Sequence, residues 1–258
     1  MIVFSLKGKL KIIAGTLFLA ALALFVGHSY SDNAKEIVTA IAGNEALKPV
    51  YEVATDEKKV AISFDACWGA EKTDDILKIL DDNGVKATFF LVNIWLEDYP
   101  DKAKEVTKRG HEIGLHSTTH PHFTQLSVDK MKEELTRNKD LVKKVTGYDS
   151  KVFRPPFGDY NNDVINTARD LGLTTIQWSV DSLDWKENLA AQDIIQRIME
   201  RVDKGAIILM HNDGQYTPEV IKVVLPELKK QGYSIVPVSQ LLIKEDWYVD
   251  SKGVQRKR

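Results

Sequence analysis

The sequence lacks the features on which several common classes of function depend. Cys67 is the one cysteine among 258 residues, which excludes an internal disulfide and a metal site of the CxxC type. The formal net charge is only −2, so no strong field indicates a nucleic-acid partner. No G-x-G-x-x-G motif follows a strand pattern and no P-loop occurs, which argues against a nucleotide-binding sheet. The chain also has no short internal repeat and no low-complexity block.

The N-terminus carries an apolar run. Residues 12–26 are uncharged and follow Lys7, Lys9 and Lys11, which is the layout of a signal peptide. The run is shorter than the roughly 20 residues that span a bilayer comfortably, and no convincing A-x-A cleavage site follows it. We expect residues 1–30 to be a cleaved signal or a retained membrane anchor that leaves the rest of the chain exported. The alternative is a buried core helix.

The remaining chain alternates between strand and helix patterns. A polar linker or stalk at 31–57, with a short strand near 50–53, is expected to precede one domain at 58–245 and a basic tail at 246–258. Apolar, β-rich runs predict seven strands, at residues 60–64, 87–92, 112–115, 151–153, 174–180, 206–210 and 233–238. Helical patterns separate most of them, at 73–82, 127–145, 162–171, 192–202 and from Thr217, the expected cap residue, to before Gly232. Seven such units favour a barrel-like α/β fold.

Two histidines follow one of these predicted strands. His116 and His120 lie four residues apart, and Pro121 argues against a helix that carries both. Neutral imidazole is a common zinc ligand, so the pair is either half of a metal site or two polar loop histidines.

The ends of other predicted strands favour the metal site. In a β/α barrel the active site forms at the carboxyl ends of the strands. Five predicted strands deliver chemically active side chains to that end: Asp65, His116 with His120, Arg154, the pair Asp184 and Trp185, and His211. Chance would scatter such residues over both ends of the barrel, so we interpret them as one active site.

Each residue then has a predicted role. His116 and His120 would hold a divalent metal, zinc being the first choice, and Asp65 would act as general base, oriented by Arg154. His211 would be the general acid for a leaving amine, with its imidazole held and kept protonated by Asp184. Trp185 and Leu209 would form an apolar wall for a small acyl methyl group.

Plainer roles stay open for several of these residues. Asp65 could cap a helix, Arg154 could form a surface ion pair, and His211 could be a satisfied core histidine. Trp185 could simply belong to the core.

The motifs resemble a known family. Residues 60–242 are similar to the polysaccharide deacetylases with a NodB homology domain, carbohydrate esterase family 4. The five motifs that match, in order, are Ser63-Phe64-Asp65, His116-Ser117-Thr118-Thr119-His120, Arg154-Pro155-Pro156-Phe157-Gly158, Asp181-Ser182-Leu183-Asp184-Trp185 and Leu209-Met210-His211. The segment Ser-Phe-Asp-Ala-Cys-Trp-Gly and the overall layout look most like the sporulation deacetylases of the PdaB type.

The resemblance implies a fold and an activity. It implies a distorted seven-stranded (β/α) barrel and metal-dependent removal of acetyl groups from N-acetylated sugars. Its implied roles for Asp65, His116, His120, Arg154, Asp184 and His211 agree with those above, and Phe157 joins Trp185 and Leu209 in the substrate pocket. We expect an exported or membrane-anchored monomer that deacetylates N-acetylmuramic acid or N-acetylglucosamine in the peptidoglycan of the cell wall or spore cortex.

The chain departs from the family pattern at Ala66. The family places a second aspartate there as a third metal ligand, and a methyl group cannot bind a metal. Possible substitutes are Asp65 itself, His122 or Cys67, although the Cys67 side chain is expected on the other face of the strand from Ala66. The alternative function is therefore a weakly active or inactive glycan-binding scaffold.

Overall fold

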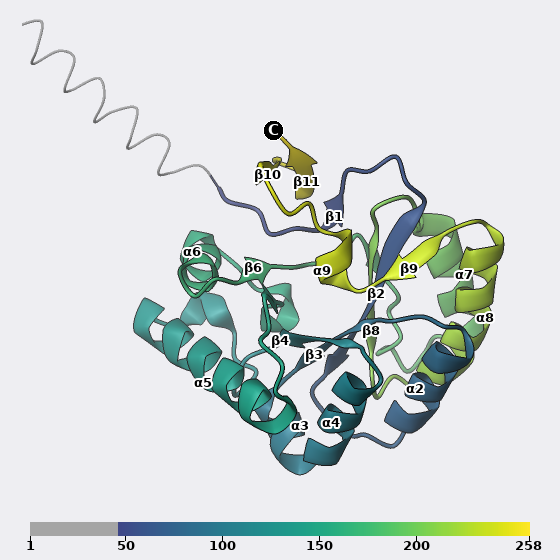
Figure 1. Cartoon of the computed structure of the whole chain (residues 1–258), viewed down its shortest axis with the longest axis horizontal. Coiled ribbons are helices and arrows are strands. Elements are labelled where there is room, and N and C mark those ends of the chain that lie inside the picture. Colours follow the sequence, from purple (N-terminus) through teal and green to yellow (C-terminus); the bar gives the residue numbers. More distant parts are fainter. Residues whose placement is uncertain (1–45) are drawn as a thin grey trace, which may run out of the picture. The chain divides into compact units, whose positions relative to one another are not determined.

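The computed structural model describes residues 46–258, and residues 47–258 form one compact unit (Figure 1). The expected export or anchor segment at 1–30 and residues 31–45 of the expected linker lie outside the described residues. Within the described part of the chain, no helix combines the length and apolarity needed to cross a membrane.

A parallel sheet forms the centre of the unit. Its strands follow the order β6-β5-β4-β3-β2-β8-β7, and β9 pairs with the start of β2. The bounds are β2 Lys59–Ala66, β3 Thr88–Leu91, β4 Glu112–Leu115, β5 Val152–Phe153, β6 Thr174–Thr175, β7 Val180–Asp181, β8 Ile207–His211 and β9 Ser234–Val236. All the pairings between these strands are parallel. The distorted (β/α) barrel is therefore confirmed.

One predicted strand is in fact two. Residues 174–180 do not form a single strand, because β6 ends at Thr175 and β7 begins at Val180, at the opposite end of the strand order. The intervening residues, 176–179, can span only about 3.5 Å each. The two edges of the sheet must therefore lie close together, so this short segment curls the sheet into its barrel shape.

Helices cover the outside of the barrel. The predicted helices are found as α2 Thr73–Asp82, α5 Val128–Thr146, α6 Asn162–Asp170, α7 Ala191–Arg201 and α8 Thr217–Lys230. Figure 1 shows α7 beside α8, and these helices pack against each other, as do α5 and α6. Ser127 caps α5 by accepting a hydrogen bond from the Lys130 amide, and Gly147 ends it in the left-handed conformation. The patterns did not predict α3 Asn93–Asp98, α4 Pro100–Lys108 or α9 Val238–Leu241.

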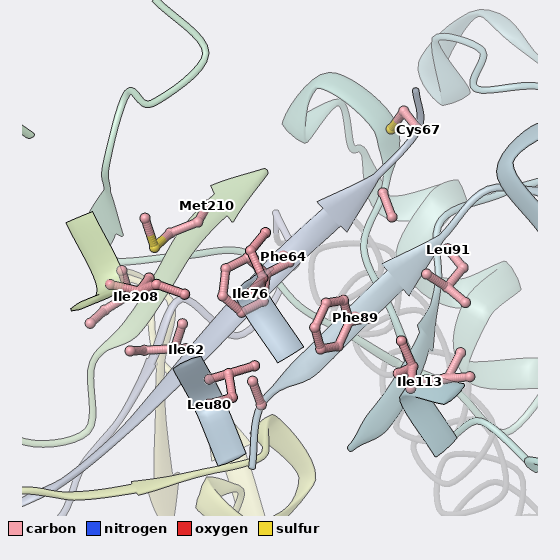
Figure 2. Close-up of a cluster of buried hydrophobic side chains, with 14 of the residues drawn as sticks. Ile62, Phe64, Cys67, Ile76, Leu80, Phe89, Leu91, Ile113, Ile208 and Met210 are labelled. Atoms are coloured by element: carbon pink, nitrogen blue, oxygen red, sulfur yellow. The ribbon is translucent and has the colours of Figure 1, made fainter. Parts of the chain in front are cut away.

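Alternation along β2 separates the core from the site. Val60, Ile62 and Phe64 belong to the main apolar cluster, where Ile62 and Phe64 lie near Ile76 and Leu80 of α2 and Ile208 and Met210 of β8 (Figure 2). Ser63 and Asp65 point the other way and are bonded to Arg154. Because side chains alternate between the two faces of a strand, one continuous strand supplies both the core and the polar interior.

Part of the expected linker and the expected tail fold together. β1 Glu52–Val53, β11 Val254–Lys257 and β10 Trp247–Val249 form a small separate sheet. Val50 and Val53 are buried, and residues 47–57 of the expected linker belong to the compact unit of residues 47–258. The Val53 amide donates to the Gly205 carbonyl just before β8, which places this sheet near the amino ends of the barrel strands. The small sheet therefore lies at the end opposite the predicted site.

Gly114 of β4 allows a close contact that supports the site. A Cβ atom at this position would lie 2.3 Å from the Phe90 ring, and that ring lies 4.2 Å from the Arg154 guanidinium. We expect Gly114→Ala to destabilise the fold by about 1–3 kcal/mol through overpacking, measured by chemical denaturation. Adding Phe90→Leu should restore part of this loss. An unchanged unfolding free energy for Gly114→Ala would contradict the contact.

Candidate active site

The structure brings the predicted site residues to one end of the barrel. Asp65 is the last but one residue of β2, and His211 is the last residue of β8. The two residues lie opposite each other in the paired strands. His116 directly follows β4 and Arg154 directly follows β5. Asp184 lies three residues beyond β7. All of these positions are at the carboxyl ends of parallel strands, where a β/α barrel builds its active site.

Asp65 and Arg154 form a buried ion pair. Arg154 Nη1 donates to Asp65 Oδ1 at 2.7 Å, and Nη2 donates to Ser63 Oγ at 2.9 Å and to the Gln177 carbonyl at 3.2 Å. Arg154 is fully buried and Asp65 is 6% exposed, so neither a surface ion pair nor a simple helix cap describes them. Burial acts to raise the pKa of Asp65, but the charge of Arg154, with those of His116 and His211, holds that pKa below its usual value. Asp65 is therefore ionised near neutral pH.

His116 presents one ring nitrogen to the site. Its Nδ1 lies 2.7 Å from the Arg154 carbonyl oxygen, which favours the tautomer with hydrogen on Nδ1 and leaves Nε2 available. His116 Nε2 is 3.6 Å from Asp65 Oδ2, too far for a hydrogen bond. Burial lowers the pKa of both site histidines, that of His120 to about 4. Both imidazoles are therefore neutral near pH 7, which is the form that binds metals.

Helix α5 holds the loop that carries the two histidines. The amides of His116 and Ser117 both donate to Asn138 Oδ1, at 3.0 and 3.1 Å. Glu134 accepts hydrogen bonds from Thr118 and Thr119. Sequence reasoning missed both α5 residues. Asn138 had a detectable signal, because it interrupts the apolar stripe of Met131, Leu135 and Val142 on an amphipathic helix.

Cys67 lies beside the two histidines. Each of Cys67, His116 and His120 offers one possible ligand atom. These three atoms all lie within 4.8 Å of one another. Cys67 directly follows β2 and is 8% exposed, and it also borders the main apolar cluster that includes Ala66. Among residues 46–258, this is the one cluster of at least three candidate side chains with metal-site spacing. Burial, with the charges of Asp65 and Asp213, raises the pKa of the metal-free thiol well above its usual value.

The other suggested substitutes for the missing aspartate do not join this cluster. His122 has a half-exposed side chain that stacks on Phe157 and lies 3.6 Å from Asp159. Asp65 is already paired with Arg154, which donates a hydrogen bond to its Oδ1. Cys67, which was expected to point to the other face of the strand from Ala66, nevertheless has its thiol within 4.8 Å of donor atoms of both histidines.

His211 and Asp184 form a second pair. His211 Nδ1 lies 2.8 Å from Asp184 Oδ1, and the His211 amide donates to Asp184 Oδ2 at 2.8 Å. Thr217 also donates to Oδ2 at 2.6 Å, so the expected cap residue of α8 is a buried partner of Asp184, and Tyr216 occupies the cap position. Burial acts to lower the pKa of His211, but the bond to Asp184 and its charge raise that pKa to about 9.

The Asp184→Asn variant tests this pair. We expect the alkaline limb of the pH profile of kcat/KM for acetate release to move down by about 2 units, because the His211 pKa falls toward its unperturbed value near 6.5. A raised pKa in the folded state stabilises the fold fully below about pH 6.5 and loses that contribution as the pH rises through about 9. The difference in unfolding free energy between wild type and variant should therefore shrink as the pH rises from about 6.5 to about 9. A variant with an unshifted alkaline limb would contradict this role for Asp184.

Exposed aromatic side chains lie near His120 and after β7. Phe157 is 61% exposed and its ring centroid lies 4.6 Å from that of His120. Trp185 is 56% exposed, so it is not a core residue, whereas Leu209 of β8 is buried. Sequence reasoning missed Trp68, which is 55% exposed and packs edge-on against His120 at 6.1 Å. Buried Asn212 holds its loop by donating to the Gly69 carbonyl at 2.7 Å.

Comparison with known proteins then decides the family. The family model described as polysaccharide deacetylase matches residues 52–176. A curated peptidoglycan-N-acetylglucosamine deacetylase of Bacillus cereus is 35% identical over 74% of this chain and 92% of its own length. The chain belongs to the polysaccharide deacetylase family. The resemblance based on five motifs is thereby confirmed, and the homologues of this chain include deacetylases, which hydrolyse the acetamide C–N bond.

Two further relatives have different names: one name states a substrate and the other states no function. The peptidoglycan-N-acetylmuramic acid deacetylase PdaA of Bacillus subtilis is 30% identical over 88% of this chain and 86% of its own length. The uncharacterised protein YlxY of Bacillus subtilis is 33% identical over 76% of this chain, which spans only 60% of that relative.

The similar solved structures include one protein that is described as a pseudoenzyme. BA3943, described as a CE4 family pseudoenzyme from Bacillus anthracis, has a TM-score of 0.73 and 33% identity over 76% of this chain and 69% of its own. A BA3943 mutant described as having restored enzymatic activity has a TM-score of 0.73 and 34% identity, over 76% of this chain and 71% of its own. The family therefore includes both active and inactive proteins, and the activity of a member depends on the residues of its own site.

Proposed function

We propose that this chain is an exported, metal-dependent N-deacetylase of peptidoglycan. It would hydrolyse the acetamide of N-acetylglucosamine or N-acetylmuramic acid residues in the cell wall or spore cortex. The observation that carries the proposal is the pairing at one end of the barrel of a buried carboxylate fixed by Arg154 with an imidazole fixed by Asp184. A chain that only binds glycans would have no need of both a base and an acid.

The donor set between these two pairs suits a divalent metal such as zinc. His116 and His120 are neutral imidazoles that would hold it together with a third ligand. When bound, such a metal polarises the amide carbonyl and lowers the pKa of a water molecule.

Asp65 and His211 would move the protons of the reaction. Asp65 is ionised and fixed by Arg154, so it can accept the proton of the attacking water. His211, whose pKa is about 9, carries a proton near neutral pH and can donate it to the leaving sugar amine. The opposite shifts of these two pKa values support Asp65 as the base and His211 as the acid.

Several features support a glycan substrate and a location outside the cytoplasm. Trp68, Phe157 and Trp185 offer exposed rings near the site, and sugar rings pack well against aromatic faces. Both Bacillus deacetylases described above carry names that state activity on peptidoglycan. The lysines and apolar run at the N-terminus support export with cleavage or membrane anchoring. The PdaB type remains our proposal for the subgroup.

Ala66 favours one alternative, a scaffold that binds peptidoglycan without turnover. A methyl group cannot replace the carboxylate that the family places there, and the fold is shared with a protein described as a pseudoenzyme.

Metal analysis combined with an acetate-release assay separates the two functions. The full-length chain and its Ala66→Asp variant would be assayed on peptidoglycan and on oligomers of each N-acetyl sugar. We expect the wild type to bind one divalent metal and release acetate, and His116→Ala to lose both. A metal-free, inactive wild type together with a variant that gains both properties would establish the scaffold instead.

A further inference from the structure

We propose that Cys67 is the third protein ligand of the metal site, in place of the family's aspartate. The inference rests on the proposed metal-dependent function and assigns to this chain a His₂Cys site formed by Cys67, His116 and His120. The ligand type, and with it the choice of metal, would then differ from those of a site with a carboxylate ligand.

The positions of the three side chains carry this assignment. Tetrahedral zinc, with bonds of about 2.1 Å to nitrogen and 2.3 Å to sulfur, holds its ligand atoms about 3.4–3.7 Å apart. The three donor atoms lie within 4.8 Å of one another without a metal, so closure needs shifts of only about 1 Å. Cys67 and His116 are both buried, and His120 is partly buried, so the cluster is enclosed by protein on most sides. Figure 2 shows the Cys67 sulfur beyond the tip of the strand that carries Phe64 and Ile62.

The orientation of His116 supports the same assignment. Its Nδ1 is fixed by the Arg154 carbonyl at 2.7 Å, which leaves Nε2 as the free ligand atom. Metal-bound histidines usually donate their other ring N–H to a carbonyl or carboxylate in this way. The loop itself is fixed by Asn138, and the His120 amide donates to Ser117 Oγ at 2.9 Å. The His116 imidazole and the backbone that carries His120 are therefore held by the fold itself.

A thiolate ligand also resolves a conflict within the site. If Asp65 replaced the missing carboxylate, it could no longer serve freely as the general base. With Cys67 as ligand, Asp65 keeps its bond to Arg154, and three protein ligands leave one coordination position open, as catalytic zinc sites require. Soft sulfur favours zinc and cobalt over magnesium and manganese. We therefore expect this chain to bind Zn²⁺ and Co²⁺ much more tightly than Mg²⁺ or Mn²⁺.

Cobalt spectroscopy of the full-length chain tests the ligand directly. After removal of metal with a chelator, titration with Co²⁺ should produce a near-ultraviolet thiolate-to-cobalt charge-transfer band that saturates at one equivalent. Because Cys67 is the one cysteine of the chain, this band can come from no other residue, and the test needs no variant. Cys67→Ser and Cys67→Ala should remove the band and weaken Zn²⁺ binding at least about 100-fold, measured by competition with a chromophoric chelator.

His122→Ala is the matched control, because this nearby histidine lies outside the cluster and should leave both measurements unchanged. Co²⁺ bound without the band, with undiminished Zn²⁺ binding in Cys67→Ala, would overturn the thiolate ligand and leave the deacetylase proposal standing if acetate is still released. The band without acetate release from any glycan would support the ligand and overturn the deacetylase proposal. A wild-type chain that binds neither Co²⁺ nor Zn²⁺ would overturn both.

Discussion

Replacing Asp65 with asparagine is expected to reduce kcat for acetate release by about 10³-fold, within the range assigned to general acid–base catalysis. Asparagine has nearly the same shape and can still accept a hydrogen bond from Arg154 through its amide oxygen, but it cannot accept the proton of the attacking water. Because Cys67, His116 and His120 are proposed as the metal ligands, the variant should keep its metal. Acetate release and metal content would be measured on the same preparation.

Asp82→Asn provides the control for this substitution. Asp82 is an exposed carboxylate at the end of α2 that pairs with Lys78, so its loss should leave acetate release unchanged. Asp65→Asn with more than about a tenth of wild-type activity would show that Asp65 is not the base. Loss of the metal along with the activity would instead make Asp65 a metal ligand.

Arg154→Met is expected to have the largest effect on stability. It leaves the Asp65 carboxylate buried without its partner, and breaking a buried ion pair in this way costs about 3–5 kcal/mol. For a folded unit of this size the melting temperature should fall by about 10 °C. The lowered pKa of Asp65 means that the pair stabilises the fold above the usual aspartate pKa and that this contribution is lost as the pH falls. The gap between wild type and variant should therefore narrow below about pH 4.

Two comparisons make this prediction specific. Arg109→Met removes an arginine that pairs with Glu105 and Asp81 near the surface, and it should cost no more than about 1 kcal/mol. Combining Arg154→Met with Asp65→Asn should cost less than the sum of the two single changes, because no charge is then left unpaired. Additive losses in urea or thermal unfolding would show that the two side chains do not act as a pair.

Much of the barrel followed from local patterns. The strands β2, β4 and β8 and the helices α2, α5 and α8 were predicted almost to their ends, because apolar spacing, cap residues and glycine stops act within a few neighbouring residues. The split between β6 and β7 was not predicted. Residues 174–180 form one apolar run, and which edge of the sheet each half joins depends on strands far away in the chain.

The sequence by itself was enough to identify the family and the candidate catalytic residues of the site. The motifs that carry Asp65, Arg154, Asp184 and His211 lie at strand ends, and parallel strands bring their ends together whatever their lengths. Only the tertiary structure decided how the site is held: Asn138 of α5 accepts from the backbone amide of His116, and Thr217 of α8 donates to the Asp184 side chain. It also decided the place of Cys67, because the distance from a thiol after β2 to imidazoles after β4 depends on the twist and closure of the whole barrel.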